Sequence, residues 1–206
     1  MTVETRLEPG PTGHCEDVIL VSGHIYGVFD GGISAATAAS EVFGDRTSAT
    51  LAELSESAQK HVDEAIGVRS AKGLPTEGLG LAVIRIEKKG IDWVYGGKTE
   101  ILIILPDGSH EHPSATKNNE ARIQSGQRKL QGIRHILLFT DGLLSQSKDI
   151  PKLIENFLNG GLKTIPTKDD TAAIAISFLP PNPARVRKKK KTEGTRGAAP
   201  RPRWGL

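Results

Sequence analysis

The most constraining feature of this sequence is a set of acidic residues at the ends of apolar runs. Four runs, CEDVILVS, IYGVFDGG, HILLFTDGLL and TKDDTAAIAISF, each place carboxylates where the apolar residues begin or stop. Short apolar runs bounded by turn residues are typical of buried strands. The acidic positions are Glu16-Asp17, Asp30-Gly31, Asp141-Gly142 and Asp169-Asp170.

Carboxylates at strand ends are held rigidly by the sheet and still reach solvent. If several of them meet at one rim, they provide the oxygen ligands that Mg²⁺ and Mn²⁺ prefer. Two such ions can clamp a phosphoryl group and activate a bridging water molecule. The set therefore predicts a site for divalent cations.

Any single Asp-Gly pair can also be an ordinary turn, because Gly tolerates positive φ and Asp hydrogen-bonds within its own turn. Asp107-Gly108, in ILIILPDGSHEH, has the pattern of such a hairpin turn and serves as an internal control. A functional site is indicated by the set of acidic positions, their order and their flanking strands.

The order of the motifs is the basis of a resemblance to a known family. The motifs are an acidic pair opening a strand, Asp-Gly running into a helix, a β-meander, Thr-Asp-Gly ending a buried strand, and an acidic pair opening the last strand. In this chain they are Glu16-Asp17, VFDGGISAATAASEV, LAVIRIEKKGIDWVYGGKTEILIILPDG, HILLFTDGLL and DDTAAIAI. Over roughly residues 13–179 the chain resembles the metal-dependent protein phosphatases of the 2C type.

The resemblance implies a Mg²⁺- or Mn²⁺-dependent phosphoserine/phosphothreonine protein phosphatase in which a water bridging two ions attacks phosphorus. Its partner would be a phosphorylated protein substrate. The metal ligands it implies are Asp17, Asp30, Gly31 through its carbonyl, Asp141 and Asp169. Of these, Asp30, Asp141 and Asp169 are the implied catalytic residues, and Glu16 and Asp170 support the ligands from behind.

Several positions depart from the family pattern. The family often carries an arginine before the acidic pair, where this chain has Pro11-Thr12-Gly13-His14. Gly32 stands where many members have a histidine, and Gly96-Gly97 stands where the meander has Gly-Asp. These departures support an alternative, a weak or inactive pseudophosphatase that acts as a regulatory binding module.

Two other constellations are weaker candidates for a site. His14 and Cys15 adjoin the first acidic pair, and His110 and His112 lie on a loop, but neither pair has a partner pair at zinc-site spacing. Cys15 lacks the loop of a cysteine phosphatase, so we expect a plain thiol.

Length and charge predict one domain with a basic tail. The 206 residues suit a single domain at 14–179, after a flexible lead at 1–13. Of the net charge of +3, the disordered tail 180–206 carries +8 (nine Lys and Arg, one Glu), which leaves −5 for the rest. An acidic partner or nucleic acid could bind the tail over 185–203, and a tail-mediated nucleic-acid-associated protein is a further alternative.

The single cysteine, Cys15, agrees with a cytoplasmic protein. The first residues lack a basic segment followed by an apolar one, and no apolar stretch is long enough to span a membrane. We therefore expect neither a signal peptide nor a membrane span.

The remaining pattern predicts an α+β protein, an α-β-β-α sandwich of two mainly antiparallel sheets with outer helices. Strands are expected over 16–22, 25–30, 79–87, 91–96, 99–105, 133–140 and 171–178. Two helices are expected within 33–66, the second capped by Asp45 or Thr47, and another over 150–158 after Asp149 as cap. Residues 106–131 are expected to be irregular, with a partly helical stretch over 118–129.

Overall fold

The structure is a computed structural model that describes residues 1–45, 49–73, 78–113, 123–144, 149–167 and 169–178. The predicted basic tail, 180–206, lies outside these residues, as do residues 118–122 of the stretch 118–129 that was expected to be partly helical. Among the described helices, none combines the length and the hydropathy that a transmembrane helix needs.

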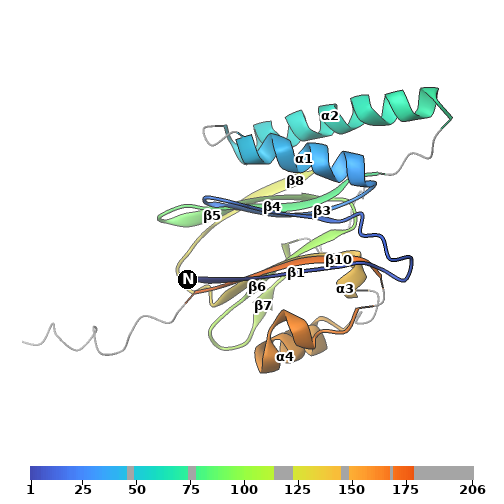
Figure 1. The fold of residues 1–206 in the computed structure, drawn as a ribbon. Coiled ribbons are helices and arrows are strands. Elements are labelled where there is room, and N and C mark those ends of the chain that lie inside the picture. Colours follow the sequence, from blue (N-terminus) through green and yellow to red (C-terminus); the bar gives the residue numbers. More distant parts are fainter. Residues whose placement is uncertain (46–48, 74–77, 114–122, 145–148, 168, 179–206) are drawn as a thin grey trace, which may run out of the picture.

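Two five-stranded sheets, with every described strand pairing antiparallel, lie face to face at the centre of the molecule (Figure 1). The first sheet has the strand order β2-β3-β4-β5-β8: Val18–Ser22, Ile25–Asp30, Gly80–Ile86, Gly90–Gly96 and Gln124–Lys129. The second has the order β1-β10-β9-β6-β7: Thr2–Glu8, Thr171–Ser177, His135–Thr140, Thr99–Ile104 and His110–Glu111.

Helices cover the outer face of each sheet (Figure 1). Helices α1 (Ile33–Asp45) and α2 (Leu51–Ala71) pack on the first sheet, and α4 (Ile150–Gly160) with the 3₁₀ turn η2 (Leu162–Thr164) packs on the second. The one-turn helix α3 (Asp141–Leu144) follows β9 directly. The predicted α-β-β-α sandwich is confirmed.

The core explains why the central strands read as continuous apolar runs. On β4, Ala82 and Ile84 point between the two sheets, while Leu81 and Val83 point under α1 and α2. Both faces of this strand are thus removed from water, so both must be apolar. Complete burial of a Leu, Ile or Val side chain contributes about 1.5–3 kcal/mol to the stability of the folded state.

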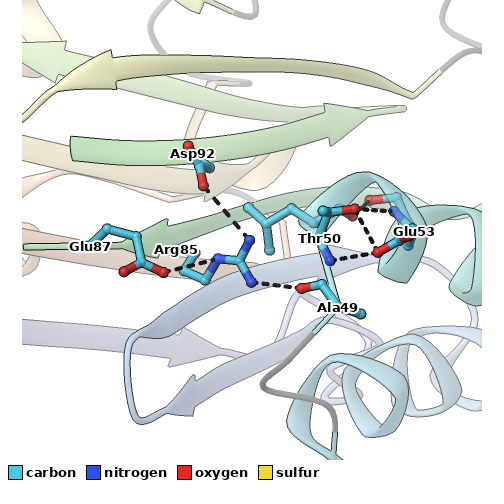
Figure 2. A network of polar contacts seen from close by, with 8 residues as sticks. Ala49, Thr50, Glu53, Arg85, Glu87 and Asp92 are labelled. Carbon is cyan, nitrogen blue, oxygen red and sulfur yellow. Dashed lines mark hydrogen bonds and ion pairs between the residues drawn. The ribbon is translucent and has the colours of Figure 1, made fainter. Parts of the chain in front are cut away.

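The start of α2 is fixed by a reciprocal capping arrangement (Figure 2). The Thr50 hydroxyl accepts from the Glu53 N–H at 3.2 Å, and the Glu53 carboxylate accepts from the Thr50 N–H at 2.8 Å. Arg85 of β4 donates to the carbonyl of Ala49 at 2.7 Å and ties this start to the sheet. The cap is therefore Thr50, and the expectation of Asp45 or Thr47 is wrong.

Two strands were not expected. Residues Thr2–Glu8, part of the expected flexible lead, form edge strand β1, which pairs with β10. Residues Gln124–Lys129, within the stretch expected to be irregular or helical, form β8, which pairs with β5. Their partners lie far away in the sequence, and edge strands need few apolar residues, so the local pattern is weak.

Two local predictions are confirmed. The Asp149 carboxylate accepts from the Lys152 N–H at 3.2 Å and caps α4, with Pro151 in the first turn. Asp107 accepts from the Ser109 N–H at 3.0 Å in the hairpin turn between β6 and β7. That turn lies at the far end of β6 from Lys98, which immediately precedes the strand.

Candidate active site

The four acidic segments lie at strand ends in both sheets. Asp30 ends β3, Asp141 follows the last residue of β9, and the pair Asp169-Asp170 immediately precedes β10. Glu16 and Asp17 immediately precede β2. The segments border a cavity of about 500 Å³, whose lining includes Glu16, Asp30, Gly31, Asp141, Asp169 and Asp170.

Asp17 is the most buried of these carboxylates, with 5% of its surface exposed. The hydroxyl of Thr140 donates to Asp17 Oδ2 at 2.6 Å and accepts from the Ala172 N–H at 3.0 Å. Burial raises the pKa of Asp17 to about 6, the Thr140 hydrogen bond opposes this rise, and the charges of Asp170 and Asp141 add to it. Thr140 thus joins three of the acidic segments.

The role of Thr140 was not predicted, although a signal for it exists. It is the Thr of the Thr-Asp-Gly motif at the end of the buried strand. Only the antiparallel pairing of β9 with β10 shows which groups its hydroxyl meets.

The pKa of Asp30 is raised more than that of Asp17. Burial raises its pKa to about 7, the charges of Asp17, Asp141 and Asp170 add to the rise, and Lys98 partly opposes it. Carboxylates from all four segments therefore repel one another here, and Lys98 is the one cation among the described lining residues that offsets them. A divalent cation would relieve this repulsion.

The donor set fits Mg²⁺ or Mn²⁺ in chemistry, since it consists of carboxylate oxygens with surplus negative charge. Among the described residues, no group of three His, Cys, Asp or Glu side chains has the arrangement that holds a metal ion. The fit therefore rests on the donor type and the charge rather than on a preformed ligand geometry. Residues that could supply ligands are Asp17, Asp30, Asp141 and Asp170, with Asp169 at the rim.

Asp169 and Asp170, the last acidic pair, differ in burial and in contacts. Asp170 is partly buried, accepts from the Glu16 N–H at 3.1 Å, and raises the pKa of Asp17 and Asp30 by its charge. Its own pKa is raised by burial and by Asp169. Asp169 is exposed. Asp169 as a ligand stays a prediction, and Asp170 becomes a candidate of equal standing.

Lys98 is a site residue that sequence reasoning missed. It lies in the turn between β5 and β6, lines the cavity, and places its Nζ 3.5 Å from Asp141 Oδ2. The charges of Asp141 and Asp30 raise the pKa of its ammonium group. The available signal was its position beside Gly96-Gly97, where the family pattern carries an acidic residue.

Gly97 has a backbone that excludes a side chain. Its φ is +71°, and a Cβ there would lie 2.6 Å from Gly80 Cα and 2.9 Å from the carbonyl oxygen of Leu79. The missing acidic residue is therefore replaced by a close contact between two backbone segments. An Asp introduced at Gly97 would disturb this contact before it could bind a cation.

The weaker candidate groups have other partners. The Cys15 thiol donates to the Asp17 carbonyl, with Sγ and O 3.8 Å apart, and burial raises its pKa, which disfavours the thiolate. His112 lies 2.8 Å from Glu100. Neither arrangement supports a zinc site or a cysteine nucleophile.

The perturbed pKa of Asp30 predicts a pH-dependent stability of the metal-free protein. Between its ordinary pKa of 3.8 and about 7, the folded state keeps a proton that the unfolded state has released. Stability therefore falls as the pH rises through this window. Asp30→Asn removes the effect, so its gain in unfolding free energy over the wild type should be larger at pH 8 than at pH 5 by about 1–2 kcal/mol.

The measurement is chemical or thermal unfolding of both proteins in the presence of chelator at the two pH values. Comparing variant with wild type cancels the titration of groups that do not interact with Asp30, such as His135, whose pKa is lowered by burial. An equal difference at pH 5 and pH 8 would contradict the expectation.

No family model matches the sequence, and no curated protein matches it significantly. Among solved structures, the chain is similar to the Mycobacterium tuberculosis serine/threonine phosphatase PstP, with a TM-score of 0.65 and 16% identity over 86% of this chain and 98% of that chain.

Two further solved structures of serine/threonine phosphatases are also similar to this chain. The catalytic domain of PstP in complex with two manganese ions has a TM-score of 0.66 and 14% identity, covering 84% of this chain and 96% of that chain. A serine/threonine phosphatase from Staphylococcus aureus has a TM-score of 0.63 and 11% identity, covering 86% and 95%. The chain therefore has the fold of the bacterial phosphatase 2C-type serine/threonine phosphatases, as the order of its acidic motifs predicts.

Proposed function

We propose that this protein is a Mg²⁺- or Mn²⁺-dependent phosphoserine/phosphothreonine protein phosphatase. The observation that carries the proposal is the mutual repulsion of Asp17, Asp30, Asp141 and Asp170 beside one open cavity, in a fold shared with serine/threonine phosphatases. Carboxylates with raised pKa values in a cleft are typical of functional sites.

In this proposal, some residues bind the cations and others hold those ligands in position. Asp30 and Asp141 would hold the cations, with Asp17, Asp169 or Asp170 and the Gly31 carbonyl as further oxygen donors. When bound, two divalent cations supply charge neutralisation at phosphorus and an activated water. Thr140 fixes the orientation of Asp17 through its hydrogen bond, and Glu16 holds Asp170 through its backbone N–H.

The substrate that we propose is a phosphorylated protein segment. The cavity of about 500 Å³ is partly open to solvent, and its lining combines charged residues with Gly78, Leu79 and Gly80. An open, polar cleft suits a phosphorylated side chain on a larger molecule better than a buried small ligand. A contact of the tail 185–203 with an acidic partner stays a prediction.

The second candidate function is a pseudophosphatase on the same fold. It is favoured by the backbone contact at Gly97, which leaves no room for an acidic side chain, and by the lack of an arginine at Pro11–His14. Such a protein would bind cations or phosphorylated segments without turnover. The two candidates share the fold and differ in catalysis.

The deciding experiment is hydrolysis of p-nitrophenyl phosphate and of a phosphothreonine peptide by purified protein. We expect activity with Mn²⁺ or Mg²⁺ and none after EDTA treatment. Because the metal-free carboxylates repel one another, Mn²⁺ should also raise the melting temperature. Activity that survives thorough chelation would contradict the proposal. A rise in melting temperature without turnover would favour the pseudophosphatase.

A further inference from the structure

The carboxylates of the candidate site cannot by themselves bind a negatively charged phosphate group. A phosphate monoester is a dianion near neutral pH and is repelled by the acidic residues around the cavity. Among the described residues that line this cavity, Lys98 is the only basic one. The described lining of the cavity therefore offers one ammonium group that can face a phosphoryl oxygen.

Two of the arginines that the structure describes, Arg6 and Arg85, are engaged away from the cavity. Arg6 donates to the carbonyls of Leu162 and Ile165 and pairs with Glu8 at 2.7 Å, which joins β1 to η2. Arg85 donates to the Ala49 carbonyl and pairs with Asp92 at 3.7 Å (Figure 2). Arg6 thus links β1 to η2, and Arg85 links β4 to the start of α2.

The backbone of Lys98 is held in place, whereas its ammonium group is exposed. Its turn is held by the backbone contact of Gly97 with Gly80 and by the Thr99 hydroxyl, which donates to the Gly96 carbonyl at 3.0 Å. Its side chain is 75% exposed, and its contact with Asp141, at 3.5 Å, is longer than a good hydrogen bond. An exposed pair of this kind contributes little, so the ammonium can exchange partners at small cost.

We infer that Lys98 binds the phosphoryl group of the substrate and releases Asp141 when that carboxylate binds a cation. The inference rests on the proposed function and deepens it by naming the group that recognises the phosphate. Once cations share the charges of Asp141 and Asp30, their attraction on Lys98 weakens, and the ammonium group can pair with the phosphoryl group. A flexible lysine acts here as a point charge, without the two-pronged geometry of arginine.

The test compares Lys98→Met with Lys89→Met, which removes the same charge from the turn between β4 and β5. The probe is inorganic phosphate, titrated into Mn²⁺-loaded protein by calorimetry, with phosphopeptide kinetics where turnover exists. We expect Lys98→Met to weaken phosphate binding by about 10- to 100-fold and to raise KM, while Lys89→Met changes neither. Mn²⁺ binding should be unchanged or tighter in Lys98→Met, and Lys98→Arg should restore part of the phosphate affinity.

The outcomes separate this inference from the proposed function. If the wild type hydrolyses nothing but Lys98→Met still loses phosphate affinity, the inference holds and the phosphatase proposal fails. If the wild type is active and both methionine variants bind phosphate alike, the phosphatase proposal holds and the inference is overturned. Loss of Mn²⁺ binding in Lys98→Met, or no phosphate binding by the wild type, also overturns it.

Discussion

Replacing Asp30 or Asp141 by Asn is expected to lower metal-dependent turnover by about 1000-fold or more, equivalent to roughly 4 kcal/mol of transition-state stabilisation. Each substitution keeps the size of the side chain but removes a negative charge that the cations need. The fold should survive, because both side chains lie at the site rather than in the core: Asp141 is 45% exposed and Asp30 lines the cavity. The measurement is kcat with saturating Mn²⁺, together with the melting temperature.

The matched control is Asp107→Asn, which makes the same chemical change in an Asp-Gly pair of a hairpin turn. Asp107 is exposed and hydrogen-bonds with Ser109, to its N–H at 3.0 Å and its hydroxyl at 2.6 Å. We expect its turnover to stay within about twofold of the wild type, since surface changes away from the site have small effects. If Asp107→Asn were as damaging as Asp30→Asn, the distinction between site and turn would be wrong.

Gly142→Ala is expected to destabilise the protein by about 3 kcal/mol and to abolish high-affinity Mn²⁺ binding. A Cβ at Gly142 would lie 1.9 Å from the carbonyl oxygen of Asp170 and 2.5 Å from Thr171 Oγ1. Backbone cannot yield as a flexible side chain can, so α3 and the start of β10 must separate. That movement would carry Asp141 and Asp170 apart.

The control for this prediction is Gly67→Ala, the same substitution within α2, where a Cβ would meet no atom within 4 Å. It should stabilise the protein by about 0.5–1 kcal/mol, because Ala is the better helix former. Unfolding in urea and Mn²⁺ titration of both variants provide the measurement. A Gly142→Ala protein with wild-type stability and Mn²⁺ affinity would disprove the close contact.

Much of the fold could be predicted because its central strands are buried on both faces. The four apolar residues of HILLFT are buried on both faces of the strand, so this run admits few alternatives to a core strand. Local hydrogen-bonding chemistry was equally informative at Asp149 and Asp107, whose side chains bond to backbone groups within a few residues.

Edge strands and caps were harder to predict. β1 exposes Val3 and Leu7 and half-buries charged residues, and β8 has no apolar side chain, so neither strand has the usual pattern. Their identity depends on partners that are remote in sequence. The cap of α2 was misplaced because Ser, Thr and Asp near a helix start compete for the same role. The Arg85 contact with Ala49 accompanies the cap that forms at Thr50.

By itself, the sequence determined the order of the acidic motifs and the strands that carry them, because burial and turn chemistry act over short distances. Only the tertiary structure decided which carboxylates interact, since that depends on how the two sheets meet. It brought Asp170 into repulsion with Asp30, linked Thr140 to Asp17, and placed Lys98 beside Asp141. Charge interactions and side-chain hydrogen bonds act through space, so their partners are fixed by packing and not by spacing along the chain.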